Sequence, residues 1–297
     1  MEIRCASYYQ HLWPKVMQHP SLKMYITPRI TASDSPFLKR TNTGLGNVMF
    51  QIASCYGLAK MTGRTVVWNK LQEFANQLYT KFALHHKDTI FRNCSITVEA
   101  PFHQIHDANL YSYNFGLIDT LKENKEHIEL FGYLECVEYF EAYRDDIQAL
   151  FSPDESSLNI IRNAFPVLFG TEYTPISIHL RGNEYIRNSH ISTPWDYSFY
   201  LRAIDYMRKH IPNPIFCIFS DDMDYISDEL FSACKPYIKM GHSNDYIDLW
   251  CMTLCKHHIV SRSTFSFWGA YLNTNPDKIV LYNDNEAKPY HSNFTPI

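Results

Sequence analysis

The chain has 297 residues, enough for one large domain or two ordinary ones around a substantial core. Its hydrophobic fraction of 45% and charged fraction of 20% are typical of a globular protein. The net charge is −4 and no basic patch is visible, which argues against nucleic acid as a partner. No apolar run approaches the ~20 residues that span a membrane, and the first residues lack the apolar core of a signal peptide. We therefore expect membrane attachment only through an anchor absent from this chain.

The eight cysteines form no CxxC pair, so we predict no structural zinc site. Their even number would allow disulfides if the chain is luminal. Sequons for N-glycosylation begin at Asn93 and Asn293, and they favour a secretory location. The aromatic fraction of 15% suits a core, and it is also compatible with rings that stack on sugars.

In chain order, residues 1–36 carry four prolines and little periodicity, which predicts an irregular arm or stem. Short apolar runs then alternate with helical patterns, which is typical of an α/β fold. Residues 152–174 join two predicted halves, an N-terminal lobe at 37–174 and a C-terminal lobe at 175–297. The predicted strands are Thr65–Asn69, Ser95–Glu99, Ile128–Tyr133, Ile176–Leu180, Ile215–Ser220, His257–Ser261 and Lys278–Tyr282. The predicted helices are Asn47 to about Met61, Glu138–Phe151, Tyr197–His210, Asn244–Lys256 and one that starts near Thr264.

Two facing Rossmann-like lobes would bind a ligand in the crevice between them, at the carboxyl ends of their strands. The segment GLGN places Gly44 and Gly46 before a helix, where the backbone can approach a ligand closely, with Asn47 at the N-cap. A tight turn followed by a cap explains the same letters. In ISIHLRGNEY, a strand ends in His179 and Arg181, and the planar fork of an arginine grips phosphate well. The alternative is a surface salt bridge.

Two later segments have the same form of a strand followed by polar residues. In IFCIFSDDMD, Asp221 or Asp222 would accept hydrogen bonds from a ribose or a base, or would simply cap the next helix. Asp222 and Asp224 also match a D-x-D metal motif. In HHIVSRSTFSFWG, Ser263 and Thr264 open a helix whose free N–H groups favour an anion. We predict that the aromatic residues that follow pack in the core.

Together and in this order, these segments resemble glycosyltransferase family 11, the α-1,2-fucosyltransferases, over about residues 43–290. The family's motifs are G-L-G-N-Q-M-F-Q, G-Y-x-Q-S-x-x-Y-F, H-V-R-R-G-D-Y, F-S-D-D and D-L…M-S-x-C-K-H-H-I…S-S-F-S-W-W-G-A. They resemble Gly44–Gln51, Phe131–Phe140, His179–Tyr185, Phe219–Asp222 and Asp248–Ala270 of this chain.

The resemblance implies a GT-B-like fold and inverting transfer of L-fucose from GDP-fucose, a co-substrate, to a terminal galactose-type sugar of a glycan. It implies no resident cofactor and no metal, with the C-terminal lobe holding the nucleotide sugar and the N-terminal lobe the acceptor. Arg181 and the helix start at Ser263 and Thr264 would hold the pyrophosphate. His179 and Asp222 would contact the guanosine portion, with Asp221 also in the donor site, and Gly44, Gly46 and Asn47 would face the fucose and the acceptor. Glu184 is the candidate general base. Animal members of the family resemble Golgi type II membrane proteins.

Two alternatives stay open, one from a departure from the family pattern and one from a metal motif. Gly182 stands where the family has a second arginine, which removes one positive charge from the donor site. A catalytically weak or inactive relative that only binds a GDP-sugar or a glycan is therefore one alternative. The other is a metal-dependent glycosyltransferase built on Asp222 and Asp224.

Overall fold

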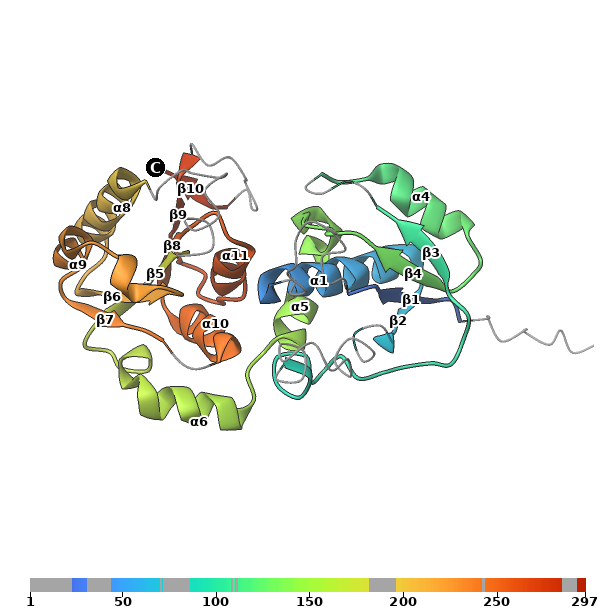
Figure 1. Cartoon of the computed structure of the whole chain (residues 1–297), viewed down its shortest axis with the longest axis horizontal. Helices are drawn as coiled ribbons and strands as arrows, with labels where there is room; N and C mark the ends of the chain where they lie inside the picture. The colour runs from blue at the N-terminus through green and yellow to red at the C-terminus, as the bar shows by residue number, and fades with distance from the viewer. Residues whose placement is uncertain are drawn as a thin grey trace, which may run out of the picture.

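The computed structural model describes residues 23–30, 44–69, 71, 86–107, 109, 112–181, 196–241, 244–284 and 293–297. Over these ranges the chain forms two parallel β-sheets, each flanked by helices (Figure 1). The first sheet takes its strands from the N-terminal part of the chain and the second from the C-terminal part. The α/β architecture predicted from the sequence is therefore present.

The first sheet has the order β2-β1-β4-β3, and every neighbouring pair of its strands is parallel. Its strands are β1 (Tyr25–Pro28), β2 (Thr65–Val66), β3 (His103–His106) and β4 (Ile128–Phe131). The predicted strands at 65–69 and 128–133 are thus present in shorter form. Parallel order places all four carboxyl ends at one edge of the sheet.

Two sequence predictions for this sheet were wrong. The arm predicted at 1–36 contains β1, a central strand whose Ile26 and Thr27 are fully buried. With four residues, β1 is too short to show an alternating pattern, and Pro28 is its last residue, beyond the two residues that pair with β2. The strand predicted at 95–99 is not regular structure; the chain enters the sheet later, at His103–His106, in a polar and mostly exposed edge strand.

The central helix of this lobe is α1 (Leu45–Thr62), close to the predicted bounds, and it ends at Gly63 in the left-handed conformation. Its N-cap is Gly44 rather than Asn47, which lies inside the first turn. Helix α4 is Phe115–Glu123. The helix predicted at 138–151 is divided into two 3₁₀ turns, Val137–Tyr139 and Glu141–Tyr143, and then α5 (Arg144–Leu150).

The second sheet has the order β10-β9-β8-β5-β6-β7, again with parallel neighbours. The strands predicted at 176–180, 215–220, 257–261 and 278–282 are all present. β7 and β10 are too short for a periodic pattern and were not predicted. The bounds are β5 (Thr174–Leu180), β6 (Pro214–Ser220), β7 (Tyr237–Lys239), β8 (His257–Val260), β9 (Val280–Tyr282) and β10 (Thr295–Pro296).

Helices α8 and α9 cover the outer face of this sheet, while α10 and α11 lie on the side toward the other lobe (Figure 1). The predictions of α8, α10 and α11 are confirmed, α8 to the residue. Helix α6 belongs to the segment that joins the lobes. The bounds are α6 (Glu155–Ala164), α8 (Tyr197–His210), α9 (Asp228–Ala233), α10 (Asp245–Leu254) and α11 (Thr264–Tyr271).

One hydrophobic core runs from the first lobe into α10 and α11 of the second. Phe50 of α1 stacks on Phe267 of α11 at 4.9 Å between ring centroids, and Phe140 stacks on Trp268 at 5.5 Å. The indole N–H of Trp250 in α10 donates to the carbonyl of Phe151 at 2.9 Å. Because α1 and α11 share this core, the starts of both helices are held in a fixed relation to each other.

Candidate functional site

Three adjacent strands bring the predicted donor segments to one edge of the second sheet. β8, β5 and β6 are neighbours and parallel, so the residues that follow them emerge at the same edge. Arg181 follows β5, Asp221 follows β6, and Ser261 follows β8. The segments are far apart in sequence, and the fold makes them neighbours.

His179 is the innermost of these residues and is 8% exposed. Its Nδ1 lies 2.9 Å from the hydroxyl of Ser261, and its ring contacts that of Phe265. Burial, followed by the positive charge of Arg181, lowers the pKa of His179 from 6.5 to about 3. His179 is therefore neutral at physiological pH, and the positive charge beside it comes from Arg181.

The aspartates at the end of β6 lie closer to the surface. Asp221 is exposed and Asp222 is half-buried. The backbone N–H of Asp222 donates to the hydroxyl of Ser220 at 3.1 Å, and its side chain forms no cap on the following 3₁₀ turn. Asp222 therefore does not cap this turn through its side chain, which was one of the two roles predicted for the aspartates.

Helix α11 begins at the same edge, directly after β8. Ser263 and Thr264 are buried, and in the described residues the Ser263 side chain caps none of the first N–H groups of the helix. Uncapped N–H groups at a helix start carry partial positive charge and attract anions. Together with Arg181, this helix start gives the edge two sources of positive potential.

The start of α1 in the other lobe contacts the start of α11. The Thr264 hydroxyl donates to Oδ1 of Asn47 at 2.6 Å, and the indole N–H of Trp268 donates to the Gly46 carbonyl at 2.9 Å. The predicted glycine segment and the predicted helix start are thus in direct contact across the two lobes.

The two glycines of that segment have different surroundings. A Cβ on Gly46 would lie 2.5 Å from the backbone N of Phe265 and 2.6 Å from the hydroxyl oxygen of Thr264, so Gly46 permits the close approach of α1 to α11. No described atom lies within 4 Å of a Cβ built on Gly44. Among the described residues, the backbone at Gly44 is therefore uncovered, whereas at Gly46 another helix fills the space.

Sequence reasoning passed over two residues that shape this edge. Ser261 bonds His179, and Trp268 bonds Gly46. Ser261 was visible as the polar residue that ends a strand, whereas the hydrogen bond of Trp268 had no sequence signal, because a buried indole was expected only as core. Glu184 and Gly182 lie outside the described residues.

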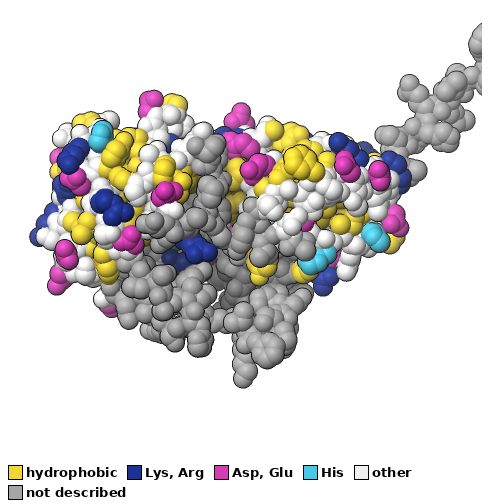
Figure 2. Space-filling model, turned by 90° about the horizontal axis from the view of Figure 1, so that it is seen from above, with side chains coloured by type: hydrophobic (Ala, Val, Ile, Leu, Met, Phe, Trp, Pro, Cys, Tyr) yellow, Lys and Arg dark blue, Asp and Glu magenta, His cyan; other side chains and the backbone are white. Residues whose placement is uncertain are grey.

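Other predictions concern metal, thiols and the surface. Within the described ranges, no group of three or more His, Cys, Asp or Glu side chains is arranged to hold a metal ion. The seven described cysteines are buried free thiols, and Cys5 lies outside this set. Among the described helices, none is long and apolar enough to cross a membrane. Acidic and basic side chains are interspersed on the face shown in Figure 2, where some Lys and Arg side chains lie between the two lobes.

The sequence matches the model of a known protein family. That model, Glycosyl transferase family 11, matches residues 9–296. The chain belongs to that family. The resemblance drawn from the sequence motifs is thereby confirmed, and with it the glycosyltransferase class at the level of the family.

Curated relatives of this family 11 chain come from bacteria and mammals. An Escherichia coli O-antigen biosynthesis glycosyltransferase, WbnK, is 32% identical over 51% of this chain and 53% of its own length. An Escherichia coli α-1,2-colitosyltransferase is 27% identical over 50% of this chain and 52% of its own length. A Bos taurus galactoside 2-α-L-fucosyltransferase, SEC1, is 27% identical over 82% of this chain and 66% of its own length. The chain thus spans about half the length of the two bacterial relatives.

Among solved structures, the crystal structure of NodZ α-1,6-fucosyltransferase soaked with GDP-fucose superposes with a TM-score of 0.50 at 14% sequence identity. The match covers 84% of this chain and 92% of that chain. At this identity the likeness concerns the fold, and it agrees with the predicted GT-B-like arrangement of two parallel-sheet lobes.

Proposed function

We propose that this chain transfers L-fucose from GDP-fucose to the 2-hydroxyl of a terminal galactose-type sugar of a glycan, with inversion at the anomeric carbon. The observation that carries the proposal is the family 11 match over residues 9–296, together with relatives named galactoside 2-α-L-fucosyltransferases. In this reaction the bond between the anomeric carbon and the phosphate oxygen breaks. The acceptor oxygen forms the new bond and loses its proton, and GDP leaves.

The departing GDP needs positive potential aimed at its phosphates. Such electrostatic stabilisation of the transition state is usually the largest single contribution to catalysis. Arg181 and the uncapped start of α11 at Ser263 and Thr264 support the assignment of the pyrophosphate to this edge. His179 is buried beside Arg181 and neutral, so it adds hydrogen-bonding capacity without charge. We assign it, with Asp221 and Asp222, to the guanosine portion.

We assign the fucose and the acceptor to the side of α1. Within the described part of the chain nothing covers the backbone of Gly44, and a hydrogen bond from Thr264 holds Asn47 in place. Glu184 remains our proposed general base. The reaction as proposed requires no resident cofactor and no metal ion, because Arg181 and the helix start take the part that a cation plays elsewhere.

The decisive test is release of GDP from GDP-fucose that depends on a galactoside acceptor and persists in EDTA. Arg181→Ala should reduce transfer by at least about 100-fold, the usual effect of removing one group that stabilises transition-state charge. Arg162→Ala is the matched control, since Arg162 lies exposed on α6, in the segment that joins the lobes, and should leave the rate unchanged. A transfer rate close to normal in Arg181→Ala would contradict the assignment of Arg181 to the donor site.

Two other outcomes of this assay would replace the proposal. Loss of activity in EDTA with recovery in manganese would favour a metal-dependent transferase built on Asp222 and Asp224. Calorimetric binding of GDP-fucose without turnover on any galactoside would favour a binding protein, which the Gly182 departure from the family motif motivates.

A different donor sugar is the second candidate. The α-1,2-colitosyltransferase relative is 27% identical over 154 residues, and its name gives a transferred sugar other than fucose. A panel of activated deoxyhexoses, assayed with one galactoside acceptor, separates the two. Faster transfer from the colitosyl donor would shift the donor assignment and leave the pyrophosphate assignment intact.

A further inference from the structure

A separate pocket lies between the lobes, away from the strand ends that form the candidate donor site. Its volume is about 100 Å³, several times the ~10–15 Å³ that one water needs. Lys278 precedes β9 and Asn293 precedes β10, so both lie at the amino ends of these parallel strands. Arg144 opens α5 in the other lobe. The lining residues are Arg144, Pro276, Lys278, Val280, Asn293 and Phe294.

Lys278 brings an ammonium group into this pocket. Nζ donates to the carbonyls of Ala270 and Asn273, at 2.7 and 2.6 Å, where α11 ends. An ammonium group has three donors, and the bonds to described residues use two of them. Burial, and then the charge of Arg144, lowers the pKa of Lys278 from 10.5 to about 8. The two cations thus lie close enough to disfavour each other.

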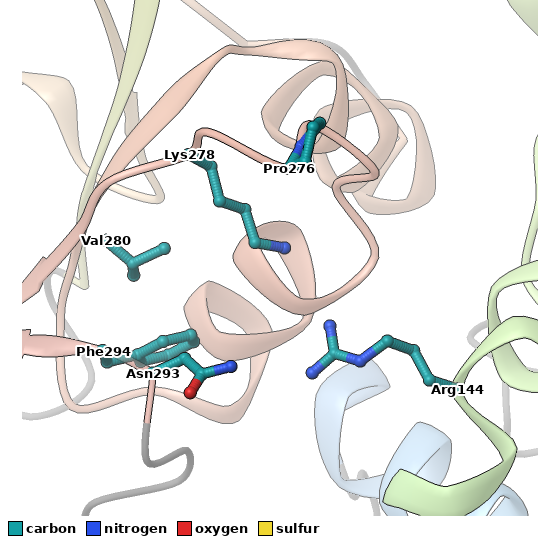
Figure 3. Close-up of a pocket in the computed structure, with 6 residues that line it drawn as sticks. All are labelled: Arg144, Pro276, Lys278, Val280, Asn293 and Phe294. Carbon is teal, nitrogen blue, oxygen red and sulfur yellow. The ribbon is translucent and has the colours of Figure 1, made fainter.

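Arg144 reaches the same space from the opposite lobe (Figure 3). Its guanidinium lies 4.3 Å from the ring centroid of Tyr271, and its Nε and Nη2 donate to Oε1 of Glu141. The pocket has a net charge of about +1, because the Glu141 carboxylate offsets one of the two cations, Lys278 and Arg144. Asn293 turns its side chain toward the two cations (Figure 3).

We propose that this pocket binds a small oxyanion of the size and charge of phosphate, held between Lys278 and Arg144 with the Asn293 amide as a further donor. The volume fits one such ion, and cations of both lobes converge on it. Val280 is buried and Phe294 is half-buried in the wall, so part of the site is apolar and strengthens charge pairing. A bound oxyanion would connect α5 of one lobe to β9 and β10 of the other.

The pocket has no part in the proposed transfer reaction, so its test is one of binding and stability. Thermal unfolding of the whole chain is followed at pH 7 in sodium phosphate and in sodium chloride of equal ionic strength. An ion that binds only the folded state raises the midpoint. We expect tens of millimolar phosphate to raise the unfolding midpoint by about 2 °C relative to chloride. The shift should saturate as the phosphate concentration rises. Titration calorimetry should give the same phosphate affinity as the thermal shift.

Asn293→Asp is the informative variant, because it places a carboxylate where the oxyanion would lie and leaves the bonds of Lys278 to the end of α11 intact. It should abolish the phosphate shift and raise the midpoint in chloride alone. Lys278→Met should also abolish the shift, but it lowers the midpoint itself by removing the bonds to Ala270 and Asn273. The control is Arg181→Ala, which removes a cation at the donor site and should retain the full shift.

Three results would overturn the proposal. A full phosphate shift in Asn293→Asp would place the ion elsewhere, and loss of the shift in Arg181→Ala would place it at the donor site. An equal effect of chloride would mean that ionic strength alone is responsible. None of these results depends on the transferase assay, so the pocket and the proposed reaction fail or stand separately.

Discussion

The Thr264 hydroxyl donates a 2.6 Å hydrogen bond to Oδ1 of Asn47, which joins the first turns of α11 and α1 across the two lobes. The residues are separated by 217 positions in the sequence. Thr264 is buried, so loss of its partner would leave a polar group without an equivalent contact. The bond therefore couples the position of the candidate donor edge to the other lobe.

This coupling is measurable with a double-mutant cycle. Asn47→Ala and Thr264→Val should each lower the free energy of unfolding by about 1–2 kcal/mol, and the double variant should cost about 1 kcal/mol less than their sum. Asn47→Asp keeps an oxygen acceptor and serves as the control. Denaturant titration gives all four values, and strictly additive losses would show that the bond contributes nothing.

Gly46 tests the close approach of the same two helices. A Cβ there would lie 2.5 Å from a backbone atom of Phe265, and backbone cannot move aside as a flexible side chain can. We expect Gly46→Ala to lower the free energy of unfolding by about 1–3 kcal/mol, the usual cost of overpacking, and to weaken GDP-fucose binding by displacing the start of α11.

Gly44→Ala is the matched control, because it lies two residues away and no described atom is within 4 Å of the new methyl group. Its φ of −62° is also one that alanine adopts readily. A loss of only about 0.5 kcal/mol is expected, because alanine is a poorer N-cap than glycine but meets no described atom here. Equal losses in both variants would indicate a general effect of altering this segment rather than contact with α11.

Trp268 connects the shared core to the same junction. It is fully buried, stacks on Phe140 and donates its indole N–H to the Gly46 carbonyl. Trp268→Phe should cost about 2–4 kcal/mol of unfolding free energy, because it leaves a cavity and a carbonyl without its donor. Phe115→Ala, at a side chain that is 75% exposed, is the control and should change stability by less than about 0.5 kcal/mol. A loss in Trp268→Phe no larger than in the control would contradict this role.

The sequence predicted the second lobe better than the first, for a physical reason. β5 and β6 are seven-residue apolar strands buried among neighbours, so their pattern is unmistakable. β1 has four residues and β2 has two, and sheet contacts rather than local propensity make them strands. Motif order was enough to find the edge formed by Arg181 and Thr264. The contact between Asn47 and Thr264 was not predictable, because it depends on how two lobes pack.

The last prediction concerns pH. The pKa of His179 falls from 6.5 to about 3 in the fold, through burial and the neighbouring charge of Arg181. Between these values the unfolded chain binds a proton that the native chain does not, so stability is complete above pH 6.5 and decreases as the pH falls toward 3. Each such proton changes the free energy of unfolding by about 1.4 kcal/mol per pH unit.

His257 and His258 have lowered pKa values for the same main reason, burial, and add to the slope with the same sign. His179→Gln keeps a hydrogen-bonding side chain toward Ser261 and removes one titrating group. Denaturant titrations from pH 7 to pH 5 should therefore show a slope smaller by about one proton in this variant than in the parent. An unchanged slope would mean that His179 does not titrate differently in the folded and unfolded chains, and its assignment as a neutral, buried ligand of the guanosine portion would lose its electrostatic basis.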